Sequence, residues 1–478
     1  MKFPESWLRA HVEVSATTAE LEHRLTMIGL EVEGVEYLGA GLDGVVVAEI
    51  LRCERHPEAD RLQVCAVSVA AGKTVQIVCG APNARAGLKA PLATVGAVLP
   101  GGMQIKPAKL RGVDSQGMLC SAKELGIDAD ASGLLELPDD AVVGQAITTH
   151  LNLPEAIIEL GLTPNRGDCF SLRGIAFDVA AAFGARAKPF NVEPAVSHSD
   201  VATPKVRLEA GRDCPRYCGR AIEGLDANAP TPSWMRQRLQ RSGLRPISLL
   251  VDVTNYVMIE LGQPMHAFDR DSVRGDIVVR RSAGNECLSL LDAREVTVGA
   301  EYLLIADDVG PLALAGVMGG LHSRITDATA AVFLESAHFA PDAIIGRARN
   351  LGMHTDASHR FERGVDPELP RTAIEYATRL IIDIAGGRAG PIVEAVLPDQ
   401  LPVRHAVTLR RARLARLLGV KIEDDEVLRV LGGELFGGVH GLAAAADDEG
   451  ERLVVGQHHE PAVEPAGPCD GWGHVGSL

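Results

Sequence analysis

The sequence lacks any long apolar run and holds few aromatic residues. No stretch approaches the roughly 18 consecutive apolar residues needed to cross a bilayer, and the N-terminus, MKFPESWLRAHVEV, has no apolar segment of the signal-peptide kind. We therefore expect a cytoplasmic protein with no membrane partner. Aromatic residues make up 4% of the chain, and none falls between residues 39 and 148. Any nucleic-acid contact in that region is expected to rely on something other than base stacking.

The cysteines and glycines also fail to form two familiar ligand-binding patterns. The closest of the 9 cysteines are Cys214 and Cys218, with no second pair nearby, whereas zinc sites normally show two such pairs or one pair with spaced histidines. We expect free thiols in a reducing cytosol. The glycines at 316, 319 and 320 lack the lysine and Ser/Thr of a phosphate-binding loop and are expected to permit a tight turn.

The composition indicates a multi-domain globular protein. The 478 residues suggest about three domains, and a hydrophobic fraction of 46% is enough to form cores. The net charge of −16 argues against nucleic-acid binding as a bulk property. Binding depends on local patches, however, so the position of the basic residues matters more than their total.

Changes in periodicity along the chain predict an α+β protein with an inserted β-barrel. Thr17 and Glu20 fit a helix capping box, and residues 30–37 alternate as a strand does. Short β-like runs separated by Gly, Pro, Asn and Asp then suggest a small barrel. We expect this division: 1–38 and 149–200 as two parts of one N-terminal α/β domain, 39–148 as the barrel inserted between them, 205–390 as a mixed α/β domain, 402–431 as a partial helical domain with helices at Leu409–Leu418 and near Asp424–Leu431, and 432–478 as an irregular tail that is disordered or frameshifted.

Within the expected barrel, basic residues cluster in one segment. Lys106, Lys109 and Arg111 are suited to tracking a phosphate backbone, although three such residues can equally form a solvated charged face. Four motifs surround them in order: His56–Leu62, Val78–Asn83, Lys106–Gly112 and Ser115–Ser121. This set resembles the OB-type tRNA-binding barrel attached to several aminoacyl-tRNA synthetases. The resemblance implies a tRNA-binding surface that includes Lys106, Lys109, Arg111, Asn83 and Ser115 and grips tRNA by its shape.

Longer motifs in the middle of the chain narrow the resemblance. They are Thr163–Asp168, Leu249–Tyr256, Glu260–Asp269, Ala315–Gly320, Leu334–Phe339 and Thr355–Pro367. Together with the barrel motifs, they are similar to the β-subunits of bacterial phenylalanyl-tRNA synthetases, and the similarity runs from Met1 to about Leu431. A complete β-subunit continues well past this length, so the resemblance implies a chain truncated at its C-terminus.

The resemblance implies partners and cofactors for the whole enzyme. In that family an α2β2 tetramer charges tRNA(Phe), and the α-subunit activates phenylalanine with ATP and Mg²⁺. Neither cofactor is expected to bind this chain strongly. The family's metal carboxylates lie beyond the end of the resemblance, so we expect no metal site in this chain. The β-subunit supplies tRNA binding, structural support and an editing site that hydrolyses tyrosine attached to the phenylalanine tRNA.

The editing site follows from a simple limit on selectivity. A hydrophobic pocket rejects an added hydroxyl only about 100-fold, so a second, hydrolytic step is needed to remove tyrosine. By resemblance, Glu335 contacts the tyrosine hydroxyl, and His266 orients water or the terminal ribose. The remaining pocket positions implied are Thr254, Gly319, Thr355 and Ala357.

Each of these residues also has a plain structural interpretation. His266 can be a packing residue, Glu335 can cap a helix that begins after it, and Arg360, Glu362 and Arg363 can form a structural ion-pair network. Three hypotheses for the chain therefore remain: a synthetase β-subunit with an editing site, a tRNA-binding protein without catalysis, and a free-standing deacylase of mischarged tRNA.

Overall fold

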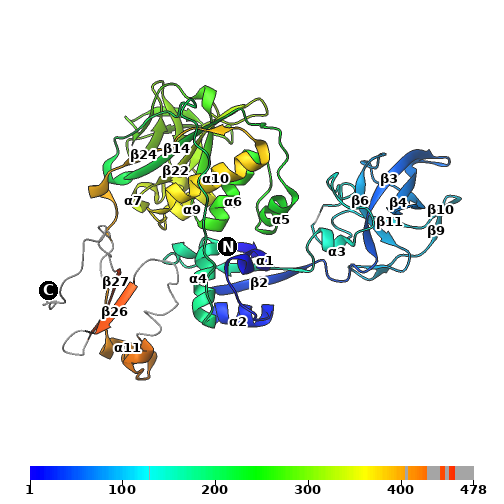
Figure 1. Ribbon diagram of the computed structural model, residues 1–478, viewed down its shortest axis with the longest axis horizontal. Coiled ribbons are helices and arrows are strands. Elements are labelled where there is room, and N and C mark those ends of the chain that lie inside the picture. Colours follow the sequence, from blue (N-terminus) through cyan, green and yellow to red (C-terminus); the bar gives the residue numbers. More distant parts are fainter. Residues whose placement is uncertain (129, 404–406, 428–441, 447–451, 458–478) are drawn as a thin grey trace, which may run out of the picture.

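The computed structural model describes residues 1–128, 130–403, 407–427, 442–446 and 452–457 (Figure 1). The fold is mixed α/β, as the sequence predicted. No helix within these residues is both long and apolar enough to cross a membrane.

The N-terminal sheet is formed by strands that are far apart in sequence. Its spatial order is β1-β12-β2, and both pairings are antiparallel. The segment after residue 148 therefore does rejoin the first 38 residues. The elements are β1 (Lys2–Pro4), α1 (Glu5–His11), α2 (Thr18–Met27), β2 (Glu31–Leu38), β12 (Glu155–Gly161), the 3₁₀ helix η1 (Gly167–Cys169) and α4 (Leu172–Phe183).

Local signals read from the sequence explain the start and end of α2. The Thr17 hydroxyl accepts a hydrogen bond from the Glu20 amide, and the Thr17 amide donates to the Glu20 carboxylate at 2.8 Å, which confirms the capping box. Gly29 has φ +92°, the left-handed region in which a helix commonly ends. The chain then enters β2.

The strands β2 and β12 also mark where the chain leaves and re-enters this sheet. Leu38, the last residue of β2, pairs directly with Glu155, the first residue of β12. The Glu155 carboxylate accepts hydrogen bonds from the Ser6 amide at 3.0 Å and from Arg241 at 3.3 Å. The segment between these strands, residues 39–154, is called the excursion below. It begins and ends at one point, where hydrogen bonds hold the Glu155 side chain in place.

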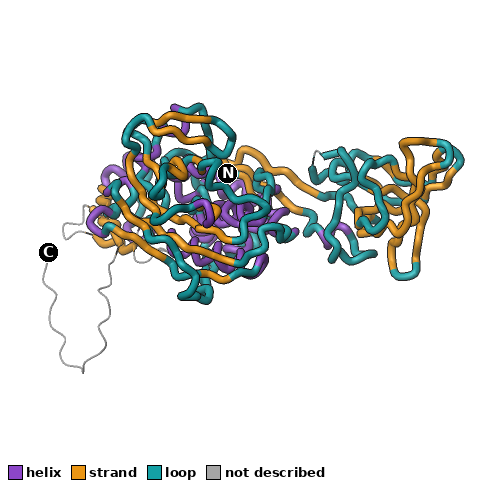
Figure 2. Tube along the Cα trace, turned by 90° about the horizontal axis from the view of Figure 1, so that it is seen from above, coloured by secondary structure: helices purple, strands orange, loops and turns teal. Residues whose placement is uncertain are grey.

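Residues 45–119 of that excursion form a five-stranded antiparallel sheet, which lies apart from the rest of the molecule (Figures 1 and 2). The strand order is β11-β6-β3-β4-β5, and two apolar clusters on this segment form cores of its own. The elements are β3 (Val45–His56), β4 (Ala59–Ala70), β5 (Lys73–Cys79), β6 (Lys89–Thr94), β7 (Val98–Leu99), β8 (Met103–Gln104), β9 (Ala108–Leu110), β10 (Val113–Ser115), β11 (Gly117–Leu119) and α3 (Ile147–His150).

Residues 205–397 fold around two further five-stranded sheets. One sheet contains β15, β22, β14, β23 and β24, and the other has the order β13-β16-β19-β20-β21. The strands are β13 (Val206–Leu208), β14 (Arg216–Glu223), β15 (Met265–Asp269), β16 (Ile277–Arg281), β17 (Glu286–Ser289), β18 (Glu295–Val298), β19 (Leu303–Ala306), β20 (Pro311–Leu314), β21 (Met318–Gly319), β22 (Ala331–His338), β23 (Arg388–Ala389) and β24 (Val393–Val396). The helices are α5 (Ser233–Arg241), α6 (Leu249–Leu261), α7 (Pro341–Ile344), α8 (Arg347–Asn350), α9 (Asp356–Phe361) and α10 (Leu369–Ala385), with short 3₁₀ helices η2 (Gly211–Asp213), η3 (Arg270–Ser272) and η4 (Pro398–Gln400).

Strand β22 is buried on both faces, and its two faces belong to different cores. Val332 and Leu334 point toward α6 and α10 and join a cluster that also contains Trp7 of α1. Phe333 and Ala337 point the other way, into a cluster shared with the second sheet. The N-terminal domain and the helices α6 and α10 therefore share one hydrophobic core, while the second sheet encloses a separate one.

The C-terminal elements differ in part from expectation. The predicted helix Leu409–Leu418 begins two residues later, as α11 (Arg411–Leu418), because residues Val407–Arg410 form strand β25. Of the second predicted helix, 424–427 are helical, and 428–431 lie outside the described residues. The prediction of an irregular tail is wrong for β26 (Leu442–Ala446) and β27 (Arg452–Gln457), which pair with β25 in a three-stranded sheet. The rest of 432–478 lies outside the described residues.

Candidate active site

The two residues expected at the centre of the site are cross-strand partners. His266 lies on β15 and Glu335 on β22, and the register places them directly opposite each other. Because side chains alternate along a strand, both point to the same face as Phe333 and Ala337, toward the second sheet. Glu335 lies within a strand, so the interpretation of this residue as a helix cap is wrong.

Glu335 is buried without a cation to balance its charge. It is 6% exposed, and within the described part of the chain it forms no salt bridge and its Oε2 has no hydrogen-bond partner. Burial raises the pKa of Glu335 to about 8, and the nearby Tyr217 hydroxyl lowers it in part. A carboxyl group in this state has an unmet capacity for hydrogen bonding.

His266 is held as a neutral imidazole. The residue reaches solvent at its edge, but its Nε2 is buried and has no partner among the described residues. Burial lowers the pKa of His266 to about 4. The ring packs edge-on against Phe268, with centroids 4.5 Å apart. His266 is thus a packed residue that also keeps one ring nitrogen unused.

Gly319 makes room for the histidine. A Cβ added at Gly319 would come within 2.5 Å of His266 Cε1 and closer still to Nε2. Gly319 lies on β21 of the second sheet, so this contact is where the two sheets meet at the site. Gly316 has φ +67° and lies under the ring of Phe361, which confirms the predicted tight turn.

The other three expected pocket residues are Thr355, Ala357 and Thr254. Thr355 caps α9 by accepting from the Ser358 amide at 3.0 Å, and its hydroxyl also donates to the Val317 carbonyl at 3.1 Å. Ala357 packs on the same apolar cluster as Phe333. Thr254 lies on α6, against the opposite face of the β15-β22-β14 sheet, and its hydroxyl donates to the Val251 carbonyl. No hydrogen bond among the described residues joins Thr254 to His266 or Glu335.

Motif analysis did not single out Tyr217. This residue lies on β14, is fully buried, and has a hydroxyl without a hydrogen-bond partner among the described residues. It shares the face of Glu335 and His266. Strand alternation would have placed it there, but only once the register between β14 and β22 was known.

The expected ion-pair network is confirmed only in part: Arg360 and Glu362 are ion-paired, Glu362 with Arg349 at 3.9 Å, whereas Arg363 forms no salt bridge among the described residues. Arg360 is 2% exposed, pairs with Asp356 at 3.1 Å and donates to the Phe170 carbonyl at 3.1 Å. Arg363 stacks over the Phe170 ring, 4.6 Å from its centroid. These contacts fix α9 to the N-terminal domain.

The expected tRNA-binding residues divide into two groups. Lys106, Lys109 and Arg111 are exposed and form no ion pair among the described residues. Ser115, by contrast, is 3% exposed, and its hydroxyl accepts from the Val78 amide at 3.1 Å, so the expectation of a tRNA contact from this side chain is corrected. Asn83 is partly buried and bridges to Leu134 through both atoms of its amide.

The basic residues lie on a small hairpin formed by β9 and β10. Leu110 pairs with Val113, so Arg111 and Gly112 form a two-residue loop with φ +44° and +85°. The His56 ring nitrogen Nε2 lies 3.1 Å from the Leu110 carbonyl and ties the hairpin to the end of β3. The His56 side chain thus holds the basic loop in place.

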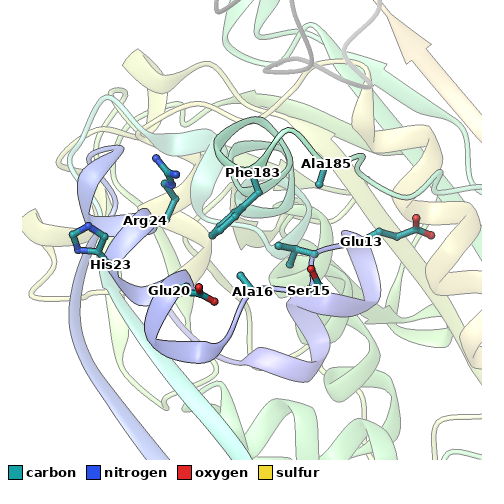
Figure 3. Close-up of a pocket in the computed structure, with 9 residues that line it drawn as sticks. Glu13, Ser15, Ala16, Glu20, His23, Arg24, Phe183 and Ala185 are labelled. Carbon is teal, nitrogen blue, oxygen red and sulfur yellow. The ribbon is translucent and has the colours of Figure 1, made fainter.

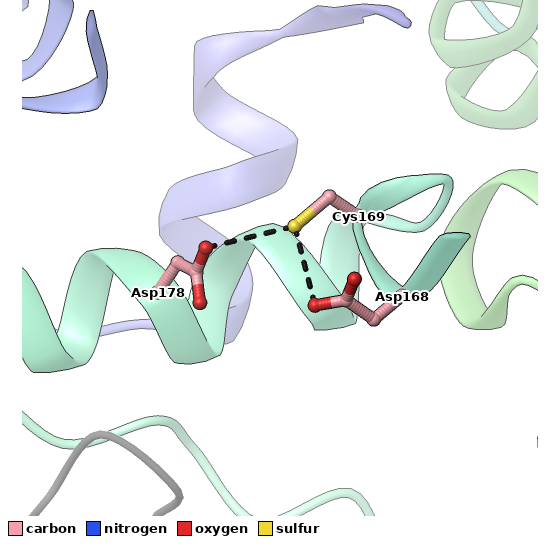
Figure 4. Close-up of side chains that lie close together, drawn as sticks. All are labelled: Asp168, Cys169 and Asp178. Carbon is pink, nitrogen blue, oxygen red and sulfur yellow. Dashed lines mark hydrogen bonds between the residues drawn. The ribbon is translucent and has the colours of Figure 1, made fainter. Parts of the chain in front are cut away.

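One cluster of residues that could ligate a metal is already paired with an arginine side chain. Asp168, Cys169 and Asp178 lie together (Figure 4). The Arg166 guanidinium pairs with Asp168 at 2.8 Å and with Asp178 at 2.5 Å. Burial raises the pKa of the Cys169 thiol, and the two carboxylates raise it further, which disfavours the thiolate that a metal would need. We assign this group to the structure of the turn before α4.

An open pocket on the N-terminal domain lies away from these residues. Figure 3 shows it between the segment that precedes α2, α2 itself and the end of α4. Glu20 at its rim is engaged in the capping box, and the Arg24 guanidinium lies 5.6 Å from the centre of the Phe183 ring. None of the predicted editing-pocket or tRNA-binding residues lines this pocket.

Two family models and several relatives match the chain. The B3/4 domain matches residues 213–386, and a putative tRNA binding domain matches residues 45–146. The phenylalanine–tRNA ligase beta subunit of Xanthomonas euvesicatoria is 61% identical over 431 residues, which covers 90% of this chain and 54% of that relative. Over 90% of its length, the chain is thus similar to a bacterial phenylalanine–tRNA ligase beta subunit.

A second relative extends the match along the chain. The beta subunit of Xylella fastidiosa is 56% identical over 456 residues, covering 95% of this chain and 56% of that relative. The chain thus spans about half the length of the phenylalanine–tRNA ligase beta subunits it matches. Within it, the B3/4 match contains His266, Gly319 and Glu335, and the tRNA-binding match contains the β9–β10 hairpin.

Proposed function

We propose that this chain provides the tRNA-binding and editing parts of a phenylalanine–tRNA ligase beta subunit, and that its active site hydrolyses tyrosyl-tRNA(Phe). The observation that carries the proposal is the buried, unpaired carboxyl of Glu335, opposite the unused Nε2 of His266. The reaction is hydrolysis of the ester between tyrosine and the terminal ribose. Water adds to the carbonyl carbon, and the ribose oxygen leaves and takes up a proton.

Glu335 is suited to recognise tyrosine by its hydroxyl. A phenolic hydroxyl can donate to an ionised carboxylate or accept from a protonated one. With phenylalanine in the pocket, the buried carboxyl stays unpaired, at a cost of about 1–3 kcal/mol. That cost corresponds to a preference of roughly 10- to 100-fold for tyrosine.

His266 is suited to orient a reacting group and not to exchange a proton with it. With a pKa lowered to about 4, it is neutral at physiological pH, and Nε2 can accept a hydrogen bond from water or from a ribose hydroxyl. Gly319 keeps this nitrogen accessible on the side of the second sheet. Thr254, Thr355 and Ala357 would shape the surroundings of the pocket.

We also propose that the sheet of residues 45–119 curls into an OB-type barrel that binds tRNA through its backbone. The support is that its two edge strands approach each other: the Gln116 amide, next to β11, donates to the Gln76 carbonyl of β5 at 2.9 Å. Lys106, Lys109 and Arg111 then form an exposed basic loop in an acidic chain. The corresponding division of the molecule is 1–38 with 149–200, 39–148, and 205–390.

For the whole enzyme, the family supports an α-subunit partner in an α2β2 tetramer working on tRNA(Phe) in the cytoplasm. ATP and Mg²⁺ would serve phenylalanine activation on that partner. A tRNA-binding protein without catalysis and a free-standing deacylase are the alternatives. Co-purification with an α-subunit separates the first proposal from a free-standing deacylase.

The proposal is tested by single-turnover deacylation of tyrosyl- and phenylalanyl-tRNA(Phe) by the purified chain. Glu335→Ala should lower the ratio of the two rates by roughly 10- to 100-fold, because the selective hydrogen bond is lost. His266→Ala should slow both reactions and leave the ratio nearly unchanged. Glu295→Ala, at an exposed position on β18, is the control and should match the wild type.

Two results would count against the proposal. A wild-type chain that binds tRNA but hydrolyses neither ester is a tRNA-binding protein without catalysis. A Glu335→Ala variant with an unchanged ratio means that this carboxyl is structural.

A further inference from the structure

Three buried polar atoms without partners gather on one face of the β15-β22-β14 sheet. They are the hydroxyl of Tyr217, Oε2 of Glu335 and Nε2 of His266, each without a hydrogen bond within the described part of the chain. An unpaired buried polar group costs about 1–3 kcal/mol, so such groups are rare and call for an explanation. The proposed function uses two of them, Glu335 and His266. It does not use Tyr217.

The strand register brings Tyr217 to Glu335. Strand β14 pairs with β22 so that Gly219 opposes Glu335 and Tyr217 opposes Ala337. Tyr217 is therefore the diagonal neighbour of Glu335 on the same face, a separation that a long aromatic side chain can bridge. On the other side of β22, His266 is the direct neighbour of Glu335. The carboxyl thus lies between a hydroxyl on one strand and an imidazole on the other.

The two groups also influence each other electrostatically. Burial raises the pKa of Tyr217 and the Glu335 carboxylate raises it further, so Tyr217 keeps its proton and remains a donor. In return, the Tyr217 hydroxyl lowers the pKa of Glu335 against the effect of burial. Within the described part of the chain neither the hydroxyl nor Oε2 has another hydrogen-bond partner, so each is free to bond to the other.

Few other titratable groups face this carboxyl. His266 on β15 is neutral, since burial lowers its pKa to about 4. Cys214, just before β14, is fully buried with a raised pKa and remains a thiol. Among the described residues no lysine or arginine forms a salt bridge with Glu335. The Cys214 thiol already donates to the Arg216 carbonyl, which leaves Tyr217 as the unpaired donor of fixed protonation among these neighbours.

We propose that Tyr217 is a specificity-determining positioning residue, whose hydroxyl donates a hydrogen bond to Glu335 and holds that carboxylate as an acceptor for the phenolic hydroxyl of a tyrosyl ester. This inference rests on the proposed editing function. The ionised carboxylate has about four acceptor positions, so one bond from Tyr217 leaves the other oxygen for the substrate. The tyrosine hydroxyl in the pocket fills the acceptor position on this second oxygen, whereas phenylalanine leaves it without a partner.

The test is Tyr217→Phe, which removes the hydroxyl and keeps the ring. Tyr302→Phe is the matched control, because Tyr302 is 5% exposed in the same apolar cluster and its hydroxyl donates to the Arg347 carbonyl instead. Deacylation of tyrosyl- and phenylalanyl-tRNA(Phe) is measured from pH 6 to 9 for both variants, for the wild type and for Glu335→Gln. The ratio of the two rates cancels the intrinsic pH dependence of ester hydrolysis.

The expected result is a change in the pH profile of the ratio. In the wild type the ratio should rise with pH, with a midpoint near 8, because the hydrogen bond that the phenol donates to ionised Glu335 is stronger than one to its neutral form. Tyr217→Phe removes a hydrogen bond to the charged form and should move the midpoint upward by about one pH unit. The smaller ionised fraction should then lower the ratio at pH 7 by up to roughly 10-fold. Glu335→Gln should show a flat profile, and Tyr302→Phe should follow the wild type. A Tyr217→Phe profile that overlays the wild type overturns the proposal.

A second measurement keeps the inference separate from the proposed function. The titration of the Glu335 carboxyl is followed by pH-difference infrared spectroscopy, with its band assigned by its loss in Glu335→Gln. Tyr217→Phe should move the midpoint of this band upward whether or not the chain hydrolyses tRNA esters. If the wild type is inactive and the band still moves, the editing function fails while the Tyr217–Glu335 interaction stands. An unmoved band refutes the interaction itself.

Discussion

At the scale of single residues, Gly319 shows how an absent side chain can shape the candidate site. An added Cβ would overlap the His266 imidazole, and the Leu291 side chain, 3.2 Å from the same position, limits any shift. Gly319→Ala should therefore displace His266 and slow deacylation of both esters by roughly 10-fold or more, the range of effects that misplacement of a catalytic group produces. Single-turnover deacylation is the measurement.

Gly310→Ala is the matched control for this substitution. Gly310 precedes β20, and a Cβ added there meets no atom within 4 Å. Its deacylation rates should match the wild type. Equal rates for the two variants would show that the space beside His266 has no role in the reaction.

The raised pKa of Glu335 should also make the free energy of unfolding depend on pH. Its pKa is raised from 4.5 to about 8, so the folded chain holds a proton that the unfolded chain releases. The contribution of Glu335 to the free energy of unfolding therefore falls as pH rises from 4.5 to 8, by at most about 1.4 kcal/mol per pH unit. His266, with its lowered pKa, acts in the opposite direction, but only below its ordinary value of 6.5.

Between pH 6.5 and 8, comparison with Glu335→Gln isolates the carboxyl, because the Met1 amino group, whose pKa burial lowers from 8.0, is the same in both proteins. Urea unfolding at these two pH values should show the wild type losing stability relative to Glu335→Gln. Parallel curves for the two proteins would mean that Glu335 is ionised in the folded chain at neutral pH.

The sequence was informative about these residues only where a motif surrounded them. Glu335, His266 and Gly319 stand in long motifs, and the structure brings all three together. Tyr217 stands in no such motif, because its place depends on the pairing of β14 with β22, two strands more than 100 residues apart. Ser115 was misread because a motif does not show which side of a strand is buried.

At the scale of elements, the β9–β10 hairpin carries an unusual turn residue. A two-residue loop with positive φ at both positions is a type I′ turn, which favours Asn-Gly. Arg111 occupies the first position with φ +44°, a conformation that costs a non-glycine residue of order 1 kcal/mol. Retaining arginine at this cost is consistent with a use for its exposed guanidinium.

Arg111→Asn separates binding from folding. Asparagine suits the turn, so thermal stability should stay the same or rise. Affinity for tRNA should nevertheless fall, and the slope of log affinity against log salt should decrease by about 0.7–0.9 if one phosphate contact is lost. Filter binding over a range of salt concentrations measures both quantities.

Arg111→Lys is the control for charge. It should keep the salt slope, although it gains nothing in the turn. An unchanged slope in Arg111→Asn would favour the interpretation of this loop as a solvated charged face.

Element boundaries show the limits of periodicity. The largely apolar run Val45–Ile50 predicts a strand of that length, but β3 extends to His56. Residues Leu51–Glu54 are polar or exposed, so no apolar alternation marks them, and their strand structure comes from pairing with β4. Helix signals were more reliable, since caps such as Thr17 act within a few residues.

At the scale of the whole molecule, the pairing of Leu38 with Glu155 predicts that the excursion can be removed. Replacing residues 39–154 with Asn-Gly would turn β2 and β12 into a hairpin in their present register. The remaining chain should keep its two cores, because neither shares residues with the clusters of the excursion. Circular dichroism and thermal unfolding should show a cooperative fold, and tRNA affinity should be lost.

The matched control removes one residue more, 38–154. That change shifts the register by one and turns the apolar side chains of one strand to the wrong face. It should unfold at a clearly lower temperature than the first variant. If both variants fail to fold, the excursion is part of the main fold and not an insertion.

The braced exit point also has a mechanical consequence. The two ends of the excursion lie side by side, because Leu38 at the end of β2 pairs with Glu155 at the start of β12. A pull on tRNA held at the outer hairpin would be borne first by Glu155, and through it by Ser6 of α1 and Arg241 of α5. The load would therefore spread into the shared core before it reached β15, and on the proposed function His266 and Glu335 would be shielded from movements of the tRNA-binding arm.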